Sequence, residues 1–199
     1  MELVKDVISG ITASMVISPS MSVIDLAIIK SQLNKQSLGH HLKNTVFQLG
    51  QYQGCIRTMT WVCGATYVTA NVTNNLLCTS LVNILAIAYK DISYSRYFTN
   101  AKVRNWRTNI LFAIRDSITI HGSFAYGPSY VYPILSQIIT TPFHIYGMDL
   151  MTRPNVTTQD RLKRVFSTYT EVCKGRVFRV VPSFIIGVSL NDVLRRQLI

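Results

Sequence analysis

Residues 58–89 read TMTWVCGATYVTANVTNNLLCTSLVNILAIAY, a run of 32 residues without Asp, Glu, Lys or Arg. A helix that spans a bilayer needs about 20 mainly apolar residues, so this run, extended by its flanks, is long enough for two spans. The segment NVTNN at residues 71–75 divides the run, because Asn favours turns over helix interiors. The stretch therefore predicts two membrane helices joined by a tight turn.

A second run of 32 residues without charge, residues 117–148, has the same form. Gly127-Pro128 and Pro133 divide it, since Gly and Pro interrupt helices. Two shorter charge-free runs cover residues 7–24 and 180–191. Counting two helices for each long run and one for each short run gives six.

We therefore predict an all-α membrane protein with six transmembrane helices in three tandem hairpins. The expected spans are residues 7–32, 56–74, 77–97, 108–127, 131–152 and 176–197. The chain is expected to form a single domain, residues 1–199, with approximate repeats at residues 1–76, 77–130 and 131–199.

The distribution of basic residues supports this count. The chain has 20 Lys and Arg against 9 Asp and Glu, a net charge of +11, although only 15% of its residues are charged. The connections at residues 30–57, 90–107 and 153–179 hold 4, 5 and 7 basic residues, which is 16 of the 20. The connections between them hold none. Six spans place all three basic connections on one side of a membrane, as the positive-inside rule predicts.

The composition also excludes other classes of protein. A content of 48% hydrophobic residues excludes simple disorder. A soluble nucleic-acid-binding protein explains the charge less well, because it would interleave basic and aromatic residues on one face. We therefore expect no nucleic-acid partner.

The sequence shows no recognisable catalytic or metal-binding motif. Cys55, Cys63, Cys78 and Cys173 form no CxxC pair and have no histidine at ligand spacing, so we expect reduced cysteines and no metal. Ser/His/Asp arrangements, phosphate-binding glycine loops and paired acids are absent at familiar spacings. We therefore expect neither an enzyme nor a cofactor.

Small residues recur every four positions in the first expected span, at Gly10, Ser14, Ser18 and Ser22. Such a stripe forms a groove in which another membrane helix can approach closely.

Prolines are expected to kink three of the helices, because proline removes a backbone hydrogen bond and clashes with the preceding turn. They are Pro19, Pro142 and Pro182. Pro19 and Pro142 lie at corresponding places in odd-numbered spans. Internal repetition of the sequence is one interpretation of this, and a tolerated bend at each proline is another. The segments that carry a family resemblance are FAIRDSIT at 112–119, TPFHIYGMD at 141–149, KGRVFRVVP at 174–182 and NDVLR at 191–195.

With these segments and its odd-helix prolines, the chain resembles the mitochondrial carrier family, in a divergent and shortened fungal form. The resemblance implies three helix pairs in the mitochondrial inner membrane that exchange a solute by alternating access. Carriers have an acid two positions after each odd-helix proline and a base three positions further on. Here these places hold Met21 and Ile24, and His144 and Gly147, so the usual salt-bridge ring cannot form. A displaced ring is conceivable from Asp25, Asp91 and Asp149 with Lys30 and Lys90.

Arg115 and Asp116 are the first candidates for a solute site, because ionisable groups inside a membrane need partners or a watery cavity. The resemblance adds Arg179 and Trp61 as substrate-binding residues. Two guanidinium groups, on Arg115 and Arg179, favour an anionic metabolite. In the alternative readings, Arg115 and Asp116 neutralise each other, Arg179 extends to the basic face, and Trp61 is a packing or interfacial aromatic residue.

Asp192 and Arg195 resemble part of the carrier family's external gate. The function that this sequence predicts is the exchange of a small organic anion, a di- or tricarboxylate, across the mitochondrial inner membrane. The alternative is a carrier-fold membrane scaffold that does not transport. The expected partners are a small anionic metabolite and anionic lipid headgroups at the basic face.

Overall fold

The computed structural model describes residues 2–34, 36–98, 106–125 and 131–197, and all the regular structure within these ranges is helical. The chain connects a series of long helices through short turns, one 3₁₀-helix (η1) and one π-helical segment (η2). The elements are α1 (Glu2–Asn34), α2 (Leu38–Phe47), η1 (Leu49–Tyr52), α3 (Gln53–Thr73), α4 (Leu76–Phe98), α5 (Trp106–Ala125), α6 (Val131–Thr152), α7 (Thr158–Val180), η2 (Val181–Gly187) and α8 (Val188–Gln197).

Each of the six expected spans coincides with a long helix, the last with the continuous α7–η2–α8 segment. Three of the described helices are long and apolar enough to cross a membrane, namely Glu2–Asn34, Leu76–Tyr94 and Thr158–Gln197. The all-helical class is confirmed, but six spans in a carrier-like arrangement of hairpins are not. The other long helices contribute polar side chains such as Thr66, Asp116 and Gln137 to the lining of an internal cavity.

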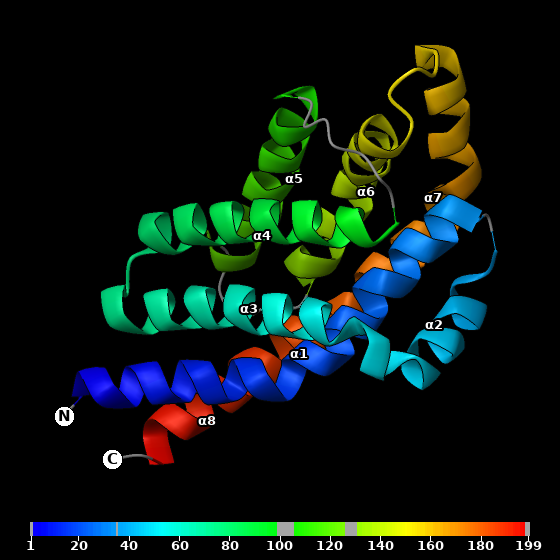
Figure 1. The fold of residues 1–199 in the computed structure, drawn as a ribbon. Coiled ribbons are helices and arrows are strands. Elements are labelled where there is room, and N and C mark those ends of the chain that lie inside the picture. Colours follow the sequence, from blue (N-terminus) through cyan, green and yellow to red (C-terminus); the bar gives the residue numbers. More distant parts are fainter. Residues whose placement is uncertain (1, 35, 99–105, 126–130, 198–199) are drawn as a thin grey trace.

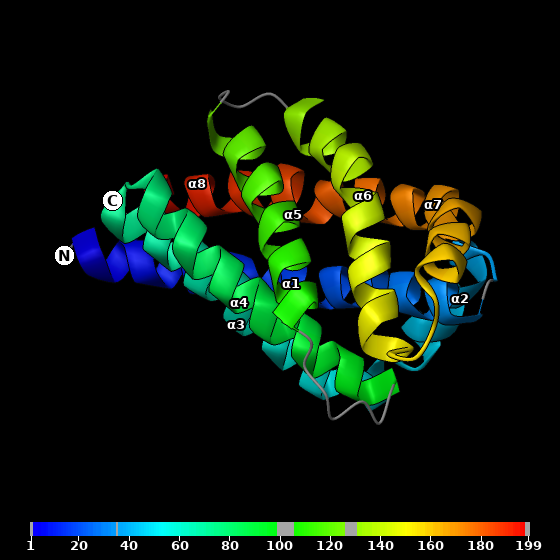
Figure 2. The ribbon, with the colours of Figure 1, turned by 90° about the horizontal axis from the view of Figure 1, so that it is seen from above.

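The two termini and the α3–α4 turn lie at one end of the molecule, whereas α2 lies at the other end (Figure 1). The view from above shows that the α5–α6 pair crosses α1 and α7 steeply, so it does not run alongside them (Figure 2). The break expected at Gly127-Pro128 lies outside the described residues.

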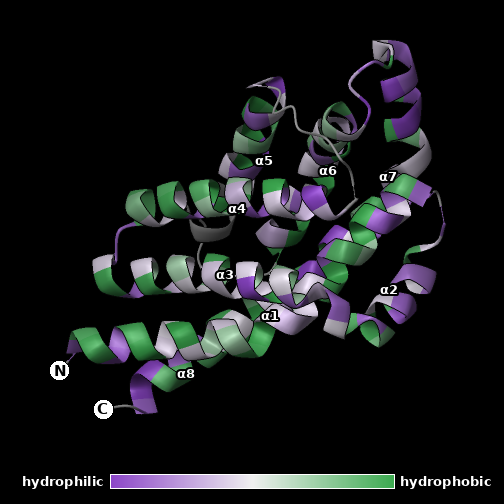
Figure 3. Ribbon diagram, in the orientation of Figure 1, coloured by the Kyte–Doolittle hydropathy of each residue, from purple (hydrophilic) through white to green (hydrophobic). Residues whose placement is uncertain are grey.

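The first half of α1 exposes apolar side chains and buries small polar ones, which is the opposite of a helix in water. Its surface exposes Ile11, Met15 and Val16, and its buried face carries Ser14 and Ser18. Apolar residues also occupy much of α4, whereas the first half of α7 is mainly hydrophilic (Figure 3). Burying polar groups while exposing apolar ones is unfavourable in water and favourable in lipid, where exposed polar groups would find no hydrogen bonds. We conclude that the chain is a multi-pass membrane protein.

The groove of small residues on α1 is where α3 packs. A Cβ atom added to Gly10 would lie 2.9 Å from both the backbone nitrogen and a side-chain methyl group of Val68. A Cβ atom added to Gly64 on α3 would lie 3.2 Å from the Ser14 hydroxyl. Backbones at this distance gain dispersion contacts that larger side chains would prevent.

The predicted prolines lie inside helical segments. Pro19 and Pro142 lie within α1 and α6, and Pro182 is the second residue of η2. The α1 ribbon changes direction about midway along its length (Figure 1). Proline leaves a carbonyl oxygen without its usual helical donor, which accounts for a bend and for the wider π-helical turn.

Asp149 fixes the end of α6 to the beginning of α7. Its carboxylate accepts hydrogen bonds from Arg153 Nε and Arg161 Nη1, each at 2.8 Å, and only 1% of its side chain is exposed. Arg164 donates to the backbone carbonyl oxygens of Gln32 and Leu33 near the end of α1. Cations stabilise the free carbonyl groups at helix C-termini, so this cluster has a structural role.

We predict that Gly10→Ala destabilises the protein by about 1–3 kcal/mol, because the new methyl group must push α1 away from α3. The measurement is unfolding of the purified protein in detergent. Gly39→Ala is the matched control, since a Cβ atom at this helical position meets no atom within 4 Å. Equal stability of the two variants would show that α1 and α3 do not pack as described.

Candidate functional site

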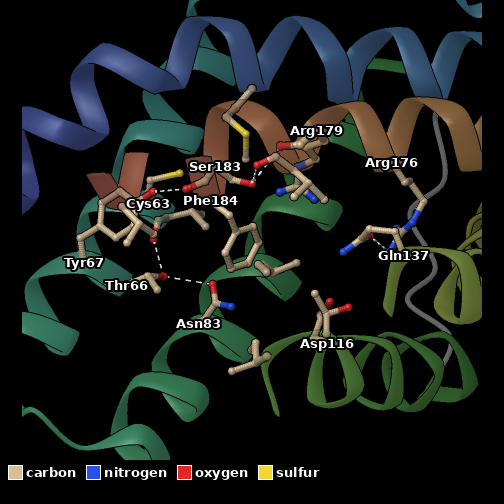
Figure 4. A pocket seen from close by; sticks show the side chains of 17 residues that line it. Cys63, Thr66, Tyr67, Asn83, Asp116, Gln137, Arg176, Arg179, Ser183 and Phe184 are labelled. Carbon is tan, nitrogen blue, oxygen red and sulfur yellow. Dashed lines mark hydrogen bonds between the residues drawn. The ribbon is translucent and has the colours of Figure 1, made fainter. Parts of the chain in front are cut away.

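A cavity lies among all the long helices, with lining residues from α1, α3, α4, α5, α6 and the α7–η2–α8 segment (Figure 4). The space inside it that a water molecule can occupy is about 110 Å³. Its lining combines apolar side chains with a few charged and polar groups, as the lining of small-molecule sites does. The cavity is therefore the main candidate for a functional site.

The charged side chains of the cavity gather at one of its ends. Asp116, Gln137, Arg176 and Arg179 lie on this side (Figure 4). Arg176 and Arg179 also line a second, smaller cavity. Behind the charged end is a cluster of ion pairs that we call the ion-pair layer. Its members are Asp25, Lys90, Asp91, Arg115, Asp116 and Arg179.

One half of the ion-pair layer joins α1, α4 and α7. Lys90 Nζ lies 2.6 Å from Asp25 Oδ2 and 3.0 Å from Asp91 Oδ1. The other oxygen of Asp25 lies 3.0 Å from Arg179 Nε. The carboxylate of Asp25 thus bridges cations from two other helices.

The other half joins α4 and α5. Arg115 Nη2 donates to Asp91 at 2.8 Å, and its Nε donates to Asp116 Oδ1 at 2.7 Å. Arg115 Nη1 lies 2.9 Å from His144 Nδ1 on α6. All the donor nitrogens of Arg115 are therefore engaged by the protein itself.

Arg176 differs from these cations because it has no carboxylate partner among the described residues. Lys90, Arg115 and Arg179 balance Asp25, Asp91 and Asp116, three charges against three. Arg176 is a fourth cation, and it donates from Nη2 to uncharged oxygens, Gln137 Oε1 at 2.7 Å and Thr140 Oγ1 at 3.1 Å. Its buried Nε has no hydrogen-bond partner within the described part of the chain. This end of the cavity therefore carries one unbalanced positive charge.

Uncharged polar groups occupy the other end of the cavity, where Thr66, Tyr67, Asn83 and Ser183 gather (Figure 4). The Tyr67 hydroxyl donates to the backbone carbonyl oxygen of Ser183 at 2.8 Å. That carbonyl belongs to η2, and π-helical turns of this kind occur often at functional sites because they leave backbone groups available.

An uncharged lock joins α3 and α8 near the termini. Asn71 and Asn191 exchange side-chain hydrogen bonds of 2.9 and 2.8 Å, and both are buried. Asn71 also donates to the backbone oxygen of Asp6 and to the Ser9 hydroxyl on α1. Along α1, Ser9 of this lock comes first, the cavity residue Met21 follows, and Asp25 of the ion-pair layer comes next.

The structure brings together three of the four predicted substrate-binding residues, Arg115, Asp116 and Arg179. Asp116 and Arg179 line the cavity, whereas Arg115 lies behind it in the ion-pair layer. Trp61 lies elsewhere, because its side of α3 faces outward. It is 57% exposed and contacts the edge of the Tyr89 ring.

The two predicted gate residues are not paired with each other. Arg195 Nε donates to Asp6 at 2.7 Å, and Asp192 is exposed on α8. The displaced ring forms only in part, through Lys90, which pairs with Asp25 and Asp91. Lys30 instead lies 3.3 Å from the Thr45 hydroxyl.

Sequence reasoning missed Arg176 and Asn83. In the sequence, Arg176 is one of the basic residues of the connection at residues 153–179. It lies one helical turn before Arg179 and therefore shares its face of the helix. Asn83 was part of an apolar run. The available signal for a site was that Asn83 is a polar residue in an apolar helix, one or two turns from other polar residues of that helix.

We predict that Asp25→Asn lowers the free energy of unfolding by about 3–5 kcal/mol, because it leaves buried cations short of a counter-ion. Glu171→Gln is the control, since the Lys174–Glu171 side chains are 63% and 38% exposed and such pairs contribute less than about 1 kcal/mol. Equilibrium unfolding in mixed micelles compares the two variants. Similar losses in both would contradict a structural role for the ion-pair layer.

Comparison with known families gives a match over almost the whole chain. The model of a family described as "probable citrulline exporter" matches residues 9–131 and 129–199. Neither the curated proteins nor the solved structures include a match. The resemblance to mitochondrial carriers is therefore wrong. It rested on short segments, none of them specific alone, and the mitochondrial location inferred from it loses its basis. The chain belongs to the probable citrulline exporter family, a family of membrane transporters.

Proposed function

We propose that this protein exports citrulline, or an amino acid of closely similar shape, through the cavity between its helices. The observation that carries the proposal is the unbalanced charge of Arg176. A guanidinium that is buried, lines a cavity and has no carboxylate partner among the described residues offers a site for the carboxylate of a ligand. The family description names a solute with one such group.

Asp116 offers hydrogen-bond acceptor positions to an α-ammonium group. It lines the same end of the cavity as Arg176. Its carboxylate accepts two hydrogen bonds from Arg115, at 2.7 and 2.8 Å, and a carboxylate offers about four acceptor positions. An ammonium group therefore has acceptor positions left, next to a cation that holds the carboxylate.

This arrangement suits an amino acid better than a di- or tricarboxylate. One unbalanced cation matches one carboxylate. A second carboxylate would reach the end of the cavity where Thr66, Tyr67 and Asn83 carry no charge, and a buried charge without a partner is costly. We therefore replace the expected organic anion with a zwitterionic amino acid.

The scaffold alternative has one observation in its favour. Arg115 is tied to Asp116, as a protein without a solute site would have it. The alternative does not account for Arg176, a buried cation that lines the cavity and has no carboxylate partner among the described residues. Transport therefore accounts for more of the structure.

We predict that Arg176→Gln lowers citrulline efflux from proteoliposomes by at least about tenfold, because a hydrogen-bonded ion pair contributes about 1.5–3 kcal/mol. Initial efflux of radiolabelled citrulline from loaded vesicles is the measurement. Arg176→Lys is expected to keep an intermediate rate, because it retains the charge and loses the paired donors.

Arg57→Gln is the matched control, since Arg57 is exposed on α3 and lies outside the cavity. Its efflux should equal that of the unmodified protein. The proposal fails if the unmodified protein in folded form releases no citrulline, or if Arg176→Gln releases it at the full rate.

A further inference from the structure

The two ends of the cavity differ in chemistry, and this difference sets the direction in which a solute can lie. Arg176 and Asp116 are at the charged end, and Asn83 is at the uncharged end (Figure 4). Seven residues separate Arg176 from Ser183, which lies beside the uncharged end, so the ends are about 10 Å apart along that helix. An extended amino acid with a long side chain can span this distance, with its α-carboxylate at one end and the tip of its side chain at the other.

Among the described residues of the uncharged end, Asn83 is the one whose N–H donors have no partner. Tyr67 is engaged with the Ser183 carbonyl group, and the Ser183 hydroxyl donates to the Arg179 carbonyl oxygen at 2.9 Å. The Thr66 hydroxyl, whose single proton is shared between two acceptors, lies 2.9 Å from the Val62 carbonyl oxygen and 3.0 Å from Asn83 Oδ1, and it holds one side of the amide. The amide nitrogen points into the cavity (Figure 4) and has no partner within the described part of the chain.

The surroundings of Asn83 oppose a charged ligand group. Ile87, Phe184 and Val188 contribute apolar side chains to the same cavity, and no carboxylate or cation accompanies Asn83 at this end among the described residues. A guanidinium, ammonium or carboxylate here would be desolvated without a counter-ion, whereas an uncharged urea or amide would only need hydrogen bonds.

We infer that Asn83, positioned by Thr66, is the specificity-determining residue that selects an uncharged urea or amide at the end of the substrate side chain. This inference rests on the proposed function and adds the orientation of the substrate. The α-carboxylate and α-ammonium groups face Arg176 and Asp116, and the side-chain tip faces Asn83. Arginine and ornithine, which share the α-groups but carry a charged tip, are rejected at Asn83.

The test exchanges the neutral amide for a carboxylate of almost the same shape. Proteoliposomes containing the full chain are loaded with radiolabelled citrulline or radiolabelled arginine, and initial efflux is measured for each. The unmodified protein is expected to release citrulline at least about tenfold faster than arginine. Asn83→Asp is expected to lower this ratio by at least about tenfold, because its carboxylate pairs with the guanidinium.

Asn75→Asp is the matched control. Asn75 precedes α4 outside the cavity, and its Oδ1 accepts a hydrogen bond from the Cys78 backbone nitrogen at 3.1 Å, which Asp also provides. Its citrulline-to-arginine ratio should equal that of the unmodified protein.

A second variant covers the case in which Asn83→Asp does not fold. Asn83→Leu keeps the size of the side chain, and it is expected to lower citrulline efflux by at least about tenfold without raising arginine efflux. The inference is overturned if citrulline efflux persists while Asn83→Asp leaves the ratio within about twofold of the unmodified value, or if Asn83→Leu releases citrulline at the full rate. Absence of citrulline efflux from the unmodified protein would instead refute the proposed function.

Discussion

The arrangement of the helices depends on a set of charges that must neutralise one another away from water. Asp25, Asp91 and Asp116 bind cations from α4, α5 and α7, with nitrogen-to-oxygen distances of 2.6 to 3.0 Å. Transferring any one of these groups alone into an apolar interior is costly, so each helix must place its charge against the next. Apolar side chains are exposed along much of α1 and α4 while the centre is charged, which is the polarity that a lipid environment requires.

The same constraint gives the cavity its character. Once three carboxylates have neutralised three cations, Arg176 is left without a charged partner among the described residues. Its guanidinium is held by Gln137 and Thr140, which orient it and do not neutralise it. The charge that the fold leaves unbalanced is thus available to a solute. The uncharged end around Asn83 then limits what the rest of that solute can be.

Much of the fold could be predicted from the sequence. The charge-free runs locate the long helices, because a membrane helix cannot carry free charges, and the small residues from Gly10 onward locate the α1–α3 contact. The number of spans and their arrangement could not be predicted in this way. The hydropathy of the sequence does not show that α5 and α6 cross α1 and α7. It also leaves the number of spans open, because three of the described helices are long and apolar enough to cross a membrane.

The site could be predicted only where a charge interrupts an apolar run. Arg115 and Asp116 are visible for this reason, although the structure assigns Arg115 to the ion-pair layer. Arg176 stands among other basic residues in the sequence, and only the packing shows that it is buried and without a carboxylate partner in the described residues. No charge interrupts the apolar run at Trp61, and the packing of α3 places its side chain on the exposed side of the helix. The family resemblance failed because it was built from short segments that several membrane proteins can share.

The central claim is that the buried charges leave one cation for the carboxylate of an amino acid. Calorimetric titration of the purified protein with citrulline and with its α-amide, in which an uncharged amide replaces the carboxylate, tests this most directly. The two compounds differ only at the group that Arg176 is expected to hold. Citrulline should bind at least about tenfold more tightly than the amide, because the amide leaves the guanidinium without a charged partner. Equal affinities for the two compounds would contradict the account.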